Sequence, residues 1–171
     1  MKARVLFFAY GSGRSQAAAH AARLIGDDAA VELTALALLP GVPRGPLGLT
    51  RDQETSAVRV LAEIAADVAR DTKRIFEGHG IRVETKAGVV ETGGLPANIA
   101  RFARDGRYDL VIMDAGEPRG IEGLAARSLA HAVARAVPCP VLLVKGSPGE
   151  VPASRRADAR EIDSRAARQI T

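Results

Sequence analysis

Apolar runs alternate with amphipathic segments along most of this chain, and each kind of segment predicts one kind of element. Apolar runs bounded by turn residues predict strands covered on both faces, at Arg4–Ala9, Ala30–Leu39, Ile81–Val90, Tyr108–Met113 and Pro140–Lys145. Apolar residues at helical spacing predict the intervening helices, at Gln16–Ile25, at Asp52–Glu77, from Gly93–Pro96 onward, and at Ser128–Val137. The alternation predicts an α/β fold, with a Rossmann-like five-stranded parallel sheet and helices on both faces.

Turn-forming and hydroxyl residues indicate where several of these elements begin and end. Ser12 or Ser15 can cap the helix that follows the first strand, and Gly26 can end that helix. The segment PGVPRGPLG, at Pro40–Gly48, predicts a long surface loop because its prolines and glycines disfavour regular structure. Thr72 is a polar break in the apolar stripe of the long second helix.

Length and composition predict one domain followed by a tail. The 171 residues suit a single domain, which we place at residues 1–146. Residues 147–171 are charged and contain two prolines, so we expect a flexible tail. Ile162, Ala166 and Ile170 recur every four residues, which leaves a weak helix as the alternative.

The positive net charge does not indicate a nucleic-acid partner. The chain carries 24 Lys and Arg against 20 Asp and Glu, a net charge of +4. Val151–Thr171 holds five Arg against three acids, which is half of that excess. The chain has no Trp and only four Phe and two Tyr, so aromatic surfaces on which bases stack are scarce.

Metal, disulfide and membrane chemistry find little support in the sequence. Cys139 is the single cysteine, so no intramolecular disulfide or cysteine metal site can form. His20, His79 and His131 lie far apart without the spacing of metal ligands. The apolar stretch Val5–Ala9 is too short for a signal peptide or a membrane span, which predicts a cytoplasmic protein without a membrane partner.

Ligands of doubly wound sheets bind beyond the carboxyl ends of the strands, where the strand order reverses. Here that position corresponds to the loops Tyr10–Arg14 and Asp114–Arg127. GSGRSQ, after the first strand, begins like a dinucleotide-binding fingerprint, but Gln16 stands at its third glycine position, and no GxxxxGK[ST] motif occurs. The glycines alone therefore indicate a turn between a strand and a helix.

The second of these loops lies in a segment with a family resemblance. DLVIMDAGEPRGIEGLAARSLAHAVARAVPCPVLLVKG, at residues 109–146, resembles the C-terminal half of the universal stress protein family. In that family a DLIVMG-like strand leads to G-x-x-G, nine residues, G-S or G-T, a helix and a CPVLVV-like strand. FFAYGS, GHGIRVE and LPANIARFA resemble other family segments, so the resemblance covers about Arg4–Gly146 and implies the family's fold.

Alignment on Cys139 carries the family's nucleotide motif over residue by residue. Ser128 matches the family's serine, and Arg127 matches the glycine before it. Glu117 and Asp114 take the places of the second and first glycines, with the spacings of nine and two residues kept. All three glycines of the motif are therefore replaced. The resemblance implies a degenerate ATP site.

Physical chemistry explains why these replacements matter for a phosphate ligand. Glycines let backbone N–H groups approach phosphate oxygens and adopt positive φ without steric cost. Asp114 and Glu117 remove that freedom and add two negative charges, each costing about 1 kcal/mol at ~4 Å from a phosphate charge in bulk water and more near a protein surface. We hypothesise that Arg127 pairs with one of these carboxylates and closes the site; the alternative is that all three side chains point into solvent.

Ser128 is expected to be an ordinary helix N-cap, with a phosphate contact as the alternative. Tyr10 replaces the aspartate that contacts the nucleoside in ATP-binding members of the family. The predicted degenerate site comprises Tyr10, Gly11, Ser12, Asp114, Glu117, Arg127 and Ser128.

These residues favour a non-catalytic stress-response or regulatory module that uses no cofactor and acts through protein partners or an unidentified small ligand. One alternative is an ATP-binding switch or weak ATPase of the same family, using Gly11, Ser12, Arg127 and Ser128. Another is an enzyme of the adenine-nucleotide α-hydrolase type. That type needs an SGGxDS-like loop after the first strand, and GSGRS lacks its aspartate.

The last predicted strand, Pro140–Lys145, should form an edge of the sheet. An apolar edge strand such as VLLV needs a cover. The resemblance implies that a second copy provides it, giving a homodimer through this strand. Cys139, in the family's CPV motif, is expected to be buried and unreactive.

Overall fold

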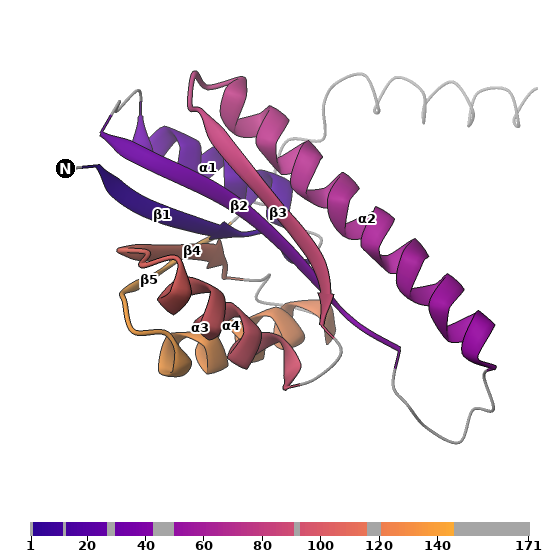
Figure 1. Ribbon diagram of the computed structural model, residues 1–171. Coiled ribbons are helices and arrows are strands. Elements are labelled where there is room, and N and C mark those ends of the chain that lie inside the picture. The colour runs from indigo at the N-terminus through magenta and orange to yellow at the C-terminus, as the bar shows by residue number, and fades with distance from the viewer. Residues whose placement is uncertain are drawn as a thin grey trace, which may run out of the picture.

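Five parallel strands form one sheet in the order β3-β2-β1-β4-β5 (Figure 1). The strands are β1 (Ala3–Phe8), β2 (Val31–Pro40), β3 (Val83–Val90), β4 (Leu110–Asp114) and β5 (Val141–Val144). The helices are α1 (Arg14–Ile25), α2 (Arg51–Glu77), α3 (Gly94–Asp105) and α4 (Ile121–Ala136). This computed structural model describes residues 2–11, 13–26, 30–42, 50–90, 93–115 and 121–145. The predicted fold class is confirmed.

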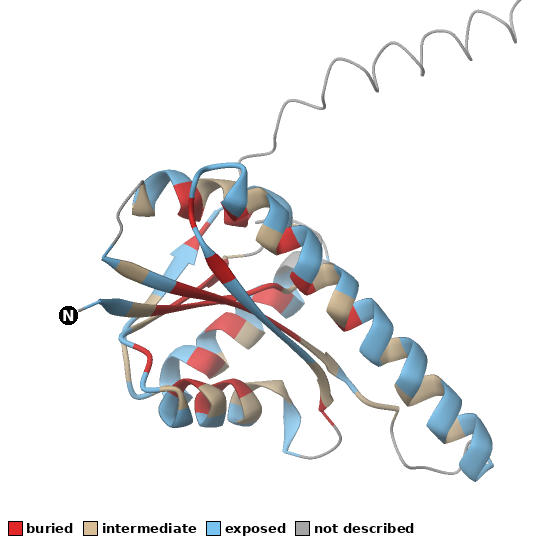
Figure 2. Ribbon diagram, turned by 45° about the horizontal axis from the view of Figure 1, so that its top comes forward, coloured by how far each residue is buried: buried red, intermediate tan, exposed pale blue. Residues whose placement is uncertain are grey.

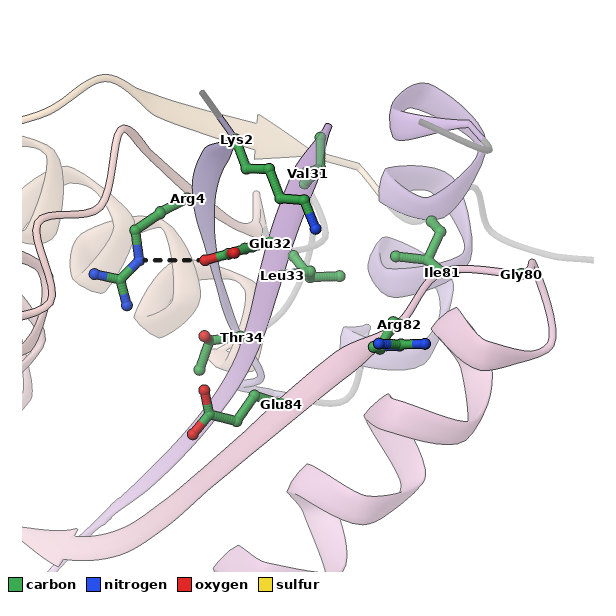
Figure 3. A pocket seen from close by; sticks show the side chains of 10 residues that line it. All are labelled: Lys2, Arg4, Val31, Glu32, Leu33, Thr34, Gly80, Ile81, Arg82 and Glu84. Atoms are coloured by element: carbon green, nitrogen blue, oxygen red, sulfur yellow. Dashed lines mark ion pairs between the residues drawn. The ribbon is translucent and has the colours of Figure 1, made fainter. Parts of the chain in front are cut away.

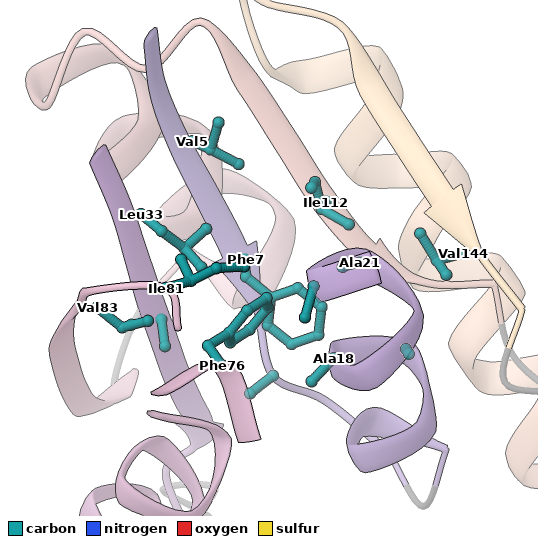
Figure 4. Close-up of a cluster of buried hydrophobic side chains, with 14 residues drawn as sticks. Val5, Phe7, Ala18, Ala21, Leu33, Phe76, Ile81, Val83, Ile112 and Val144 are labelled. Atoms are coloured by element: carbon teal, nitrogen blue, oxygen red, sulfur yellow. The ribbon is translucent and has the colours of Figure 1, made fainter. Parts of the chain in front are cut away.

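Helices cover both faces of the sheet, α1 and α2 on one face and α3 and α4 on the other (Figure 1). Alternate residues of β1 enter the two cores because side chains of a strand alternate between faces. Phe7 packs edge-to-face on Phe76 of α2, with ring centroids 5.2 Å apart (Figure 4). Leu6 and Phe8 enter the opposite core, which also contains Ile99 of α3.

The strand order places the change of direction at β1. From β1 the chain crosses to β2 on one side and later returns to β4 on the other. Phe8 is in register with Leu36 of β2 and with Met113 of β4. The carboxyl ends of β1 and β4 are therefore neighbours, as the sequence predicts for the ligand position of such a sheet.

The helix boundaries correct two predictions about serine caps. Gly13 is the N-cap of α1, and Ser15 lies inside that helix. Helix α4 begins at Ile121, seven residues before the predicted start at Ser128. Ile121 and Leu124 are exposed, so they are not part of the apolar face that packs on the core. The helical spacing of apolar residues is therefore recognisable in the sequence only after the first turns of α4.

Two smaller predictions are confirmed. Gly26 ends α1 with φ of 65°, a conformation that glycine adopts without steric cost. Thr72, the polar break in α2, is buried, and its hydroxyl donates a hydrogen bond to the carbonyl of Val68 at 2.8 Å. A polar side chain therefore lies in the core with its hydrogen bond satisfied.

The amino-terminal half of α2 is covered much less than the rest of the helix. Figure 2 shows few buried residues along that half, and Val60 and Ile64 are exposed. Within the described segments, no helix combines the length and the apolar character needed to cross a membrane. Most of the predicted loop Pro40–Gly48 and the whole tail 147–171 lie outside the described residues.

Candidate functional site at the carboxyl ends of β1 and β4

The chain leaves β1 through two residues that differ in their environment. Tyr10 is half-buried, and its ring stacks on Phe8 with centroids 5.9 Å apart and an interplanar angle of 11°. Tyr10 therefore packs back onto the core on the α3 side of the sheet. Gly11 is exposed and has φ of 77°, where a side chain would be strained.

A cation near this turn was not among the predicted site residues. The Arg14 guanidinium donates a hydrogen bond from Nη1 to the carbonyl oxygen of Gly11 at 3.0 Å. Arg14 begins α1, so its charge lies beside the turn that leaves β1. The spacing of three residues between Gly11 and Arg14 in GSGR is a signal in the sequence that could have identified this contact.

Asp114 is the last residue of β4, which corrects its assignment to a loop. Its side chain is buried, with 8% exposure. The next residue, Ala115, donates its backbone N–H to the carbonyl of Val144 at 3.0 Å, so sheet pairing continues just beyond it. The residues before and after Asp114 both take part in sheet pairing with β5, which fixes the backbone of Asp114.

The Asp114 carboxylate lies against Gly13, at the start of α1. A Cβ placed on Gly13 would collide with Oδ2 of Asp114 and lie 3.1 Å from its Cγ. Gly13 therefore provides the space that the carboxylate occupies. This contact joins the two loops that the sequence predicted to meet.

Arg127 was predicted to pair with Asp114 or Glu117; the pairing with Asp114 is wrong, and the pairing with Glu117 stays a prediction. Arg127 and Ser128 are exposed residues of α4, and the ion pairs between described residues do not include Arg127 with Asp114. The alternative, that all the side chains point into solvent, is wrong for Asp114. Ser128 lies in the interior of α4, so it is not an N-cap. Ser12 and Glu117 lie outside the described residues.

The described residues contain no candidate metal site, because no three of their His, Cys, Asp or Glu side chains lie close enough together to hold an ion. His131 is exposed on α4. Cys139 is half-buried rather than buried. Loss of solvation raises the pKa of the Cys139 thiol, and the negative charge of Asp109 raises it further, so the neutral, unreactive form is favoured.

A cavity of about 550 Å³ lies at the amino-terminal ends of β1 and β2, away from the predicted site (Figure 3). Its wall includes Lys2, Arg4 and Glu32, with 3.9 Å between Nε of Arg4 and Oε2 of Glu32. Thr34 also lines it, and the Thr34 hydroxyl accepts a hydrogen bond from the Tyr108 hydroxyl at 2.8 Å. None of the predicted site residues lines this cavity.

The two edges of the sheet differ in chemistry. Leu142 and Leu143 of β5 are 38% and 46% exposed. On β3, at the other edge, Nζ of Lys86 lies 2.7 Å from Oε1 of Glu84, and the hydrogen bond to this carboxylate raises the pKa of Lys86. One edge is therefore apolar and the other charged.

Comparison with known proteins decides the family. The model of the Universal stress protein family matches residues 3–145. The chain belongs to the universal stress protein family. It is 32% identical to a universal stress protein of Methanocaldococcus jannaschii over 87 residues, 50% of this chain and 49% of that protein. The match thus spans about half the length of that curated relative.

Solved universal stress proteins share the fold of this family member. UspA from Lactobacillus plantarum superposes with a TM-score of 0.67 at 16% identity, covering 83% of this chain and 97% of UspA. A universal stress protein from Archaeoglobus fulgidus, solved in complex with dAMP, gives a TM-score of 0.52 at 19% identity, covering 85% of this chain and 98% of that chain. At these identities the likeness establishes the fold and not the ligand.

Proposed function

We propose that this chain is a nucleotide-independent member of its family, a non-catalytic regulatory module of the stress response. It acts through its surfaces on protein partners, as a homodimer in the cytoplasm. The observation that carries the proposal is the buried carboxylate of Asp114 against Gly13. A polyphosphate entering between the ends of β1 and β4 meets this carboxylate, and an ionised carboxylate repels it.

The electrostatic argument can be given a magnitude. Two unit charges ~4 Å apart repel by about 1 kcal/mol in water and by about 4 kcal/mol near a protein surface. About 4 kcal/mol corresponds to a roughly thousandfold weaker binding constant. Arg14 offsets part of this repulsion, although one of its N–H groups is already bonded to Gly11.

Tyr10, two residues beyond the end of β1, supports the same proposal. Its ring stacks on Phe8 and belongs to the apolar core. A tyrosine in this position offers no carboxylate to the hydroxyl groups of a ribose. The degenerate nucleotide site that the sequence predicts therefore lacks a nucleoside contact as well as the glycines.

An ATP-binding switch or weak ATPase is the second candidate, and one observation favours it. The related Archaeoglobus fulgidus structure was solved in complex with dAMP. Gly11 here has the positive φ that a phosphate-binding turn can use. In this alternative Gly11, Ser12, Arg127 and Ser128 contact the nucleotide, and the Asp114 carboxylate must move away from Gly13.

Isothermal titration calorimetry separates the two candidates. The full chain, refolded or washed so that it carries no nucleotide, is titrated with ATP, with and without Mg²⁺, and with AMP. We expect no binding at micromolar concentrations. A dissociation constant in the low micromolar range for ATP would contradict the proposal, and release of phosphate at a rate that depends on this chain would support the ATPase alternative.

A further inference from the structure

Helix α1 has no negative group of its own at its amino-terminal end. Its N-cap, Gly13, has no side chain to accept a hydrogen bond, and the first turn contains no acidic residue. The amino-terminal end of a helix carries a partial positive charge that favours a nearby anion. The carboxylate beside the start of α1 comes instead from Asp114, at the end of β4.

Position 13 requires glycine because a side chain there would collide with a neighbour, and not because of its backbone conformation. Gly13 has φ of −80° and ψ of −3°, which any L-residue can adopt. A Cβ at this position would collide with Oδ2 of Asp114 and would lie 3.1 Å from Cγ and 3.4 Å from Oδ1. The two residues are therefore sterically coupled, Gly13 at the start of α1 and Asp114 at the end of β4.

We infer that Asp114 is the specificity-determining residue that closes the crevice to phosphate-bearing ligands. Its carboxylate fills the space beside the first turn of α1 that an anionic group of a ligand would need. This inference rests on the proposed function and assigns the exclusion to one side chain. Removal of the carboxylate leaves the space open, with Arg14 at its margin as a cation for an incoming anion.

The steric part of the inference predicts a non-additive pair of substitutions. Gly13→Ala should lower the melting temperature of the full chain by roughly 2–10 °C, as overpacking does in a domain of this size. In the Asp114→Ala background the same Gly13→Ala change should cost less than about 2 °C. Gly88→Ala is the matched control, because a Cβ on Gly88 would meet Leu38 Cδ2 at an ordinary 3.6 Å.

Equal costs of Gly13→Ala in both backgrounds would overturn the coupling. The same conclusion would follow if Gly13→Ala cost no more than Gly88→Ala. The coupling is supported if Gly13→Ala lowers the melting temperature of the wild-type chain but not that of Asp114→Ala. Thermal unfolding followed by circular dichroism measures the melting temperatures of all five proteins: the wild type, the two single variants, the double variant and Gly88→Ala.

The specificity part predicts a gain of anion binding. Inorganic phosphate should raise the melting temperature of Asp114→Ala by several degrees relative to the same protein in chloride of equal ionic strength. The rise should be smaller for the isosteric Asp114→Asn. Binding to the folded state alone stabilises it in this way. The wild-type chain and Asp109→Ala should show no such rise; Asp109 is an exposed carboxylate at the opposite end of β4.

The outcomes distinguish this inference from the proposed function. Phosphate that stabilises Asp114→Ala no more than the wild type and Asp109→Ala overturns the inference. If, in that case, the wild-type chain also fails to bind ATP, the proposed function stands and only the role assigned to Asp114 is lost. ATP binding by the wild-type chain with Asp114 in place overturns both, because the carboxylate then excludes nothing.

Discussion

At the scale of single residues, buried polar side chains in the described part of the chain have hydrogen-bond partners. Tyr108 and Thr34 are buried with 7% and 4% exposure, and their hydroxyls share a hydrogen bond of 2.8 Å. The Arg4 guanidinium packs over the Tyr108 ring, 5.1 Å from its centroid, and donates to the carbonyl of Gly106. These residues are far apart in the sequence, so no local pattern indicates the contact.

The Tyr108–Thr34 hydroxyl pair predicts an asymmetry between single and double substitutions. Tyr108→Phe or Thr34→Val alone should destabilise the chain by about 1–3 kcal/mol, because each leaves one buried hydroxyl without its partner. The double variant should cost less than the sum of the two, since both hydroxyls are then absent. Urea unfolding measures the three free energies of unfolding, and simple additivity would contradict the prediction.

Residue identity also explains how much of the site could be predicted. The family spacing identified Asp114, and its position after an apolar run placed it at the start of the following loop, one residue beyond where the strand proves to end. The sequence could not show that its carboxylate points towards Gly13, because that contact depends on how α1 leaves the sheet. Arg127 was expected to pair with Asp114 or Glu117. It is an exposed residue of α4 without an ion pair to Asp114, and Glu117 lies outside the described residues.

At the scale of elements, strands were more predictable than helix starts. Each end of an observed strand lies within two residues of its predicted position, because buried apolar runs end sharply at turn residues. The start of α4 was missed because Ile121 and Leu124 are exposed with 88% and 68% accessibility. The start of α2, by contrast, is fixed by a local device that a sequence can reveal.

That device is a capping box at Thr50. The Thr50 hydroxyl accepts from the backbone N–H of Gln53, and the Gln53 side chain accepts from the backbone N–H of Thr50 at 2.9 Å. Thr50→Ala should weaken the first turn by about 0.5–2 kcal/mol, which corresponds to roughly 2- to 30-fold faster exchange of its amide hydrogens. The amino-terminal half of α2 is largely exposed, so the effect should be local.

Amide hydrogen exchange followed by NMR tests this at Glu54, whose N–H donates to the Thr50 carbonyl. Thr55→Ala is the control, because Thr55 lies inside the helix and its hydroxyl donates to the carbonyl of Arg51 and takes no part in the capping box. Exchange at Glu54 that changes equally in both variants would show that the box does not stabilise the first turn.

At the scale of the whole molecule, the sequence predicted that the ends of β1 and β4 form the ligand position and that β5 is an edge strand. The sheet confirms that β1 and β4 are neighbours and that β5 lies at an edge, while the full strand order was not predicted. Whether a second copy covers β5 stays a prediction. The exposed leucines of that strand give it a physical basis, because an uncovered apolar edge is prone to pairing.

Leu143→Lys should therefore convert the proposed homodimer to monomers or aggregates, because a charge is placed in the expected interface. Leu24→Lys is the matched control: Leu24 is a leucine with 66% exposure that belongs to the last turn of α1 and not to β5. Analytical ultracentrifugation over a range of concentrations measures both. A wild-type monomer, or a Leu143→Lys dimer of unchanged affinity, would contradict this interface.

The charged pair on β3 limits how far such an assembly can grow. If two copies join through β5, their sheets merge into one continuous ribbon that ends in β3 on both sides. Glu84 and Lys86 sit on each terminal strand, and charges at a free edge discourage the addition of another chain. Polymerisation would therefore stop at two subunits, and the charged outer strands would protect the assembly from fibril growth.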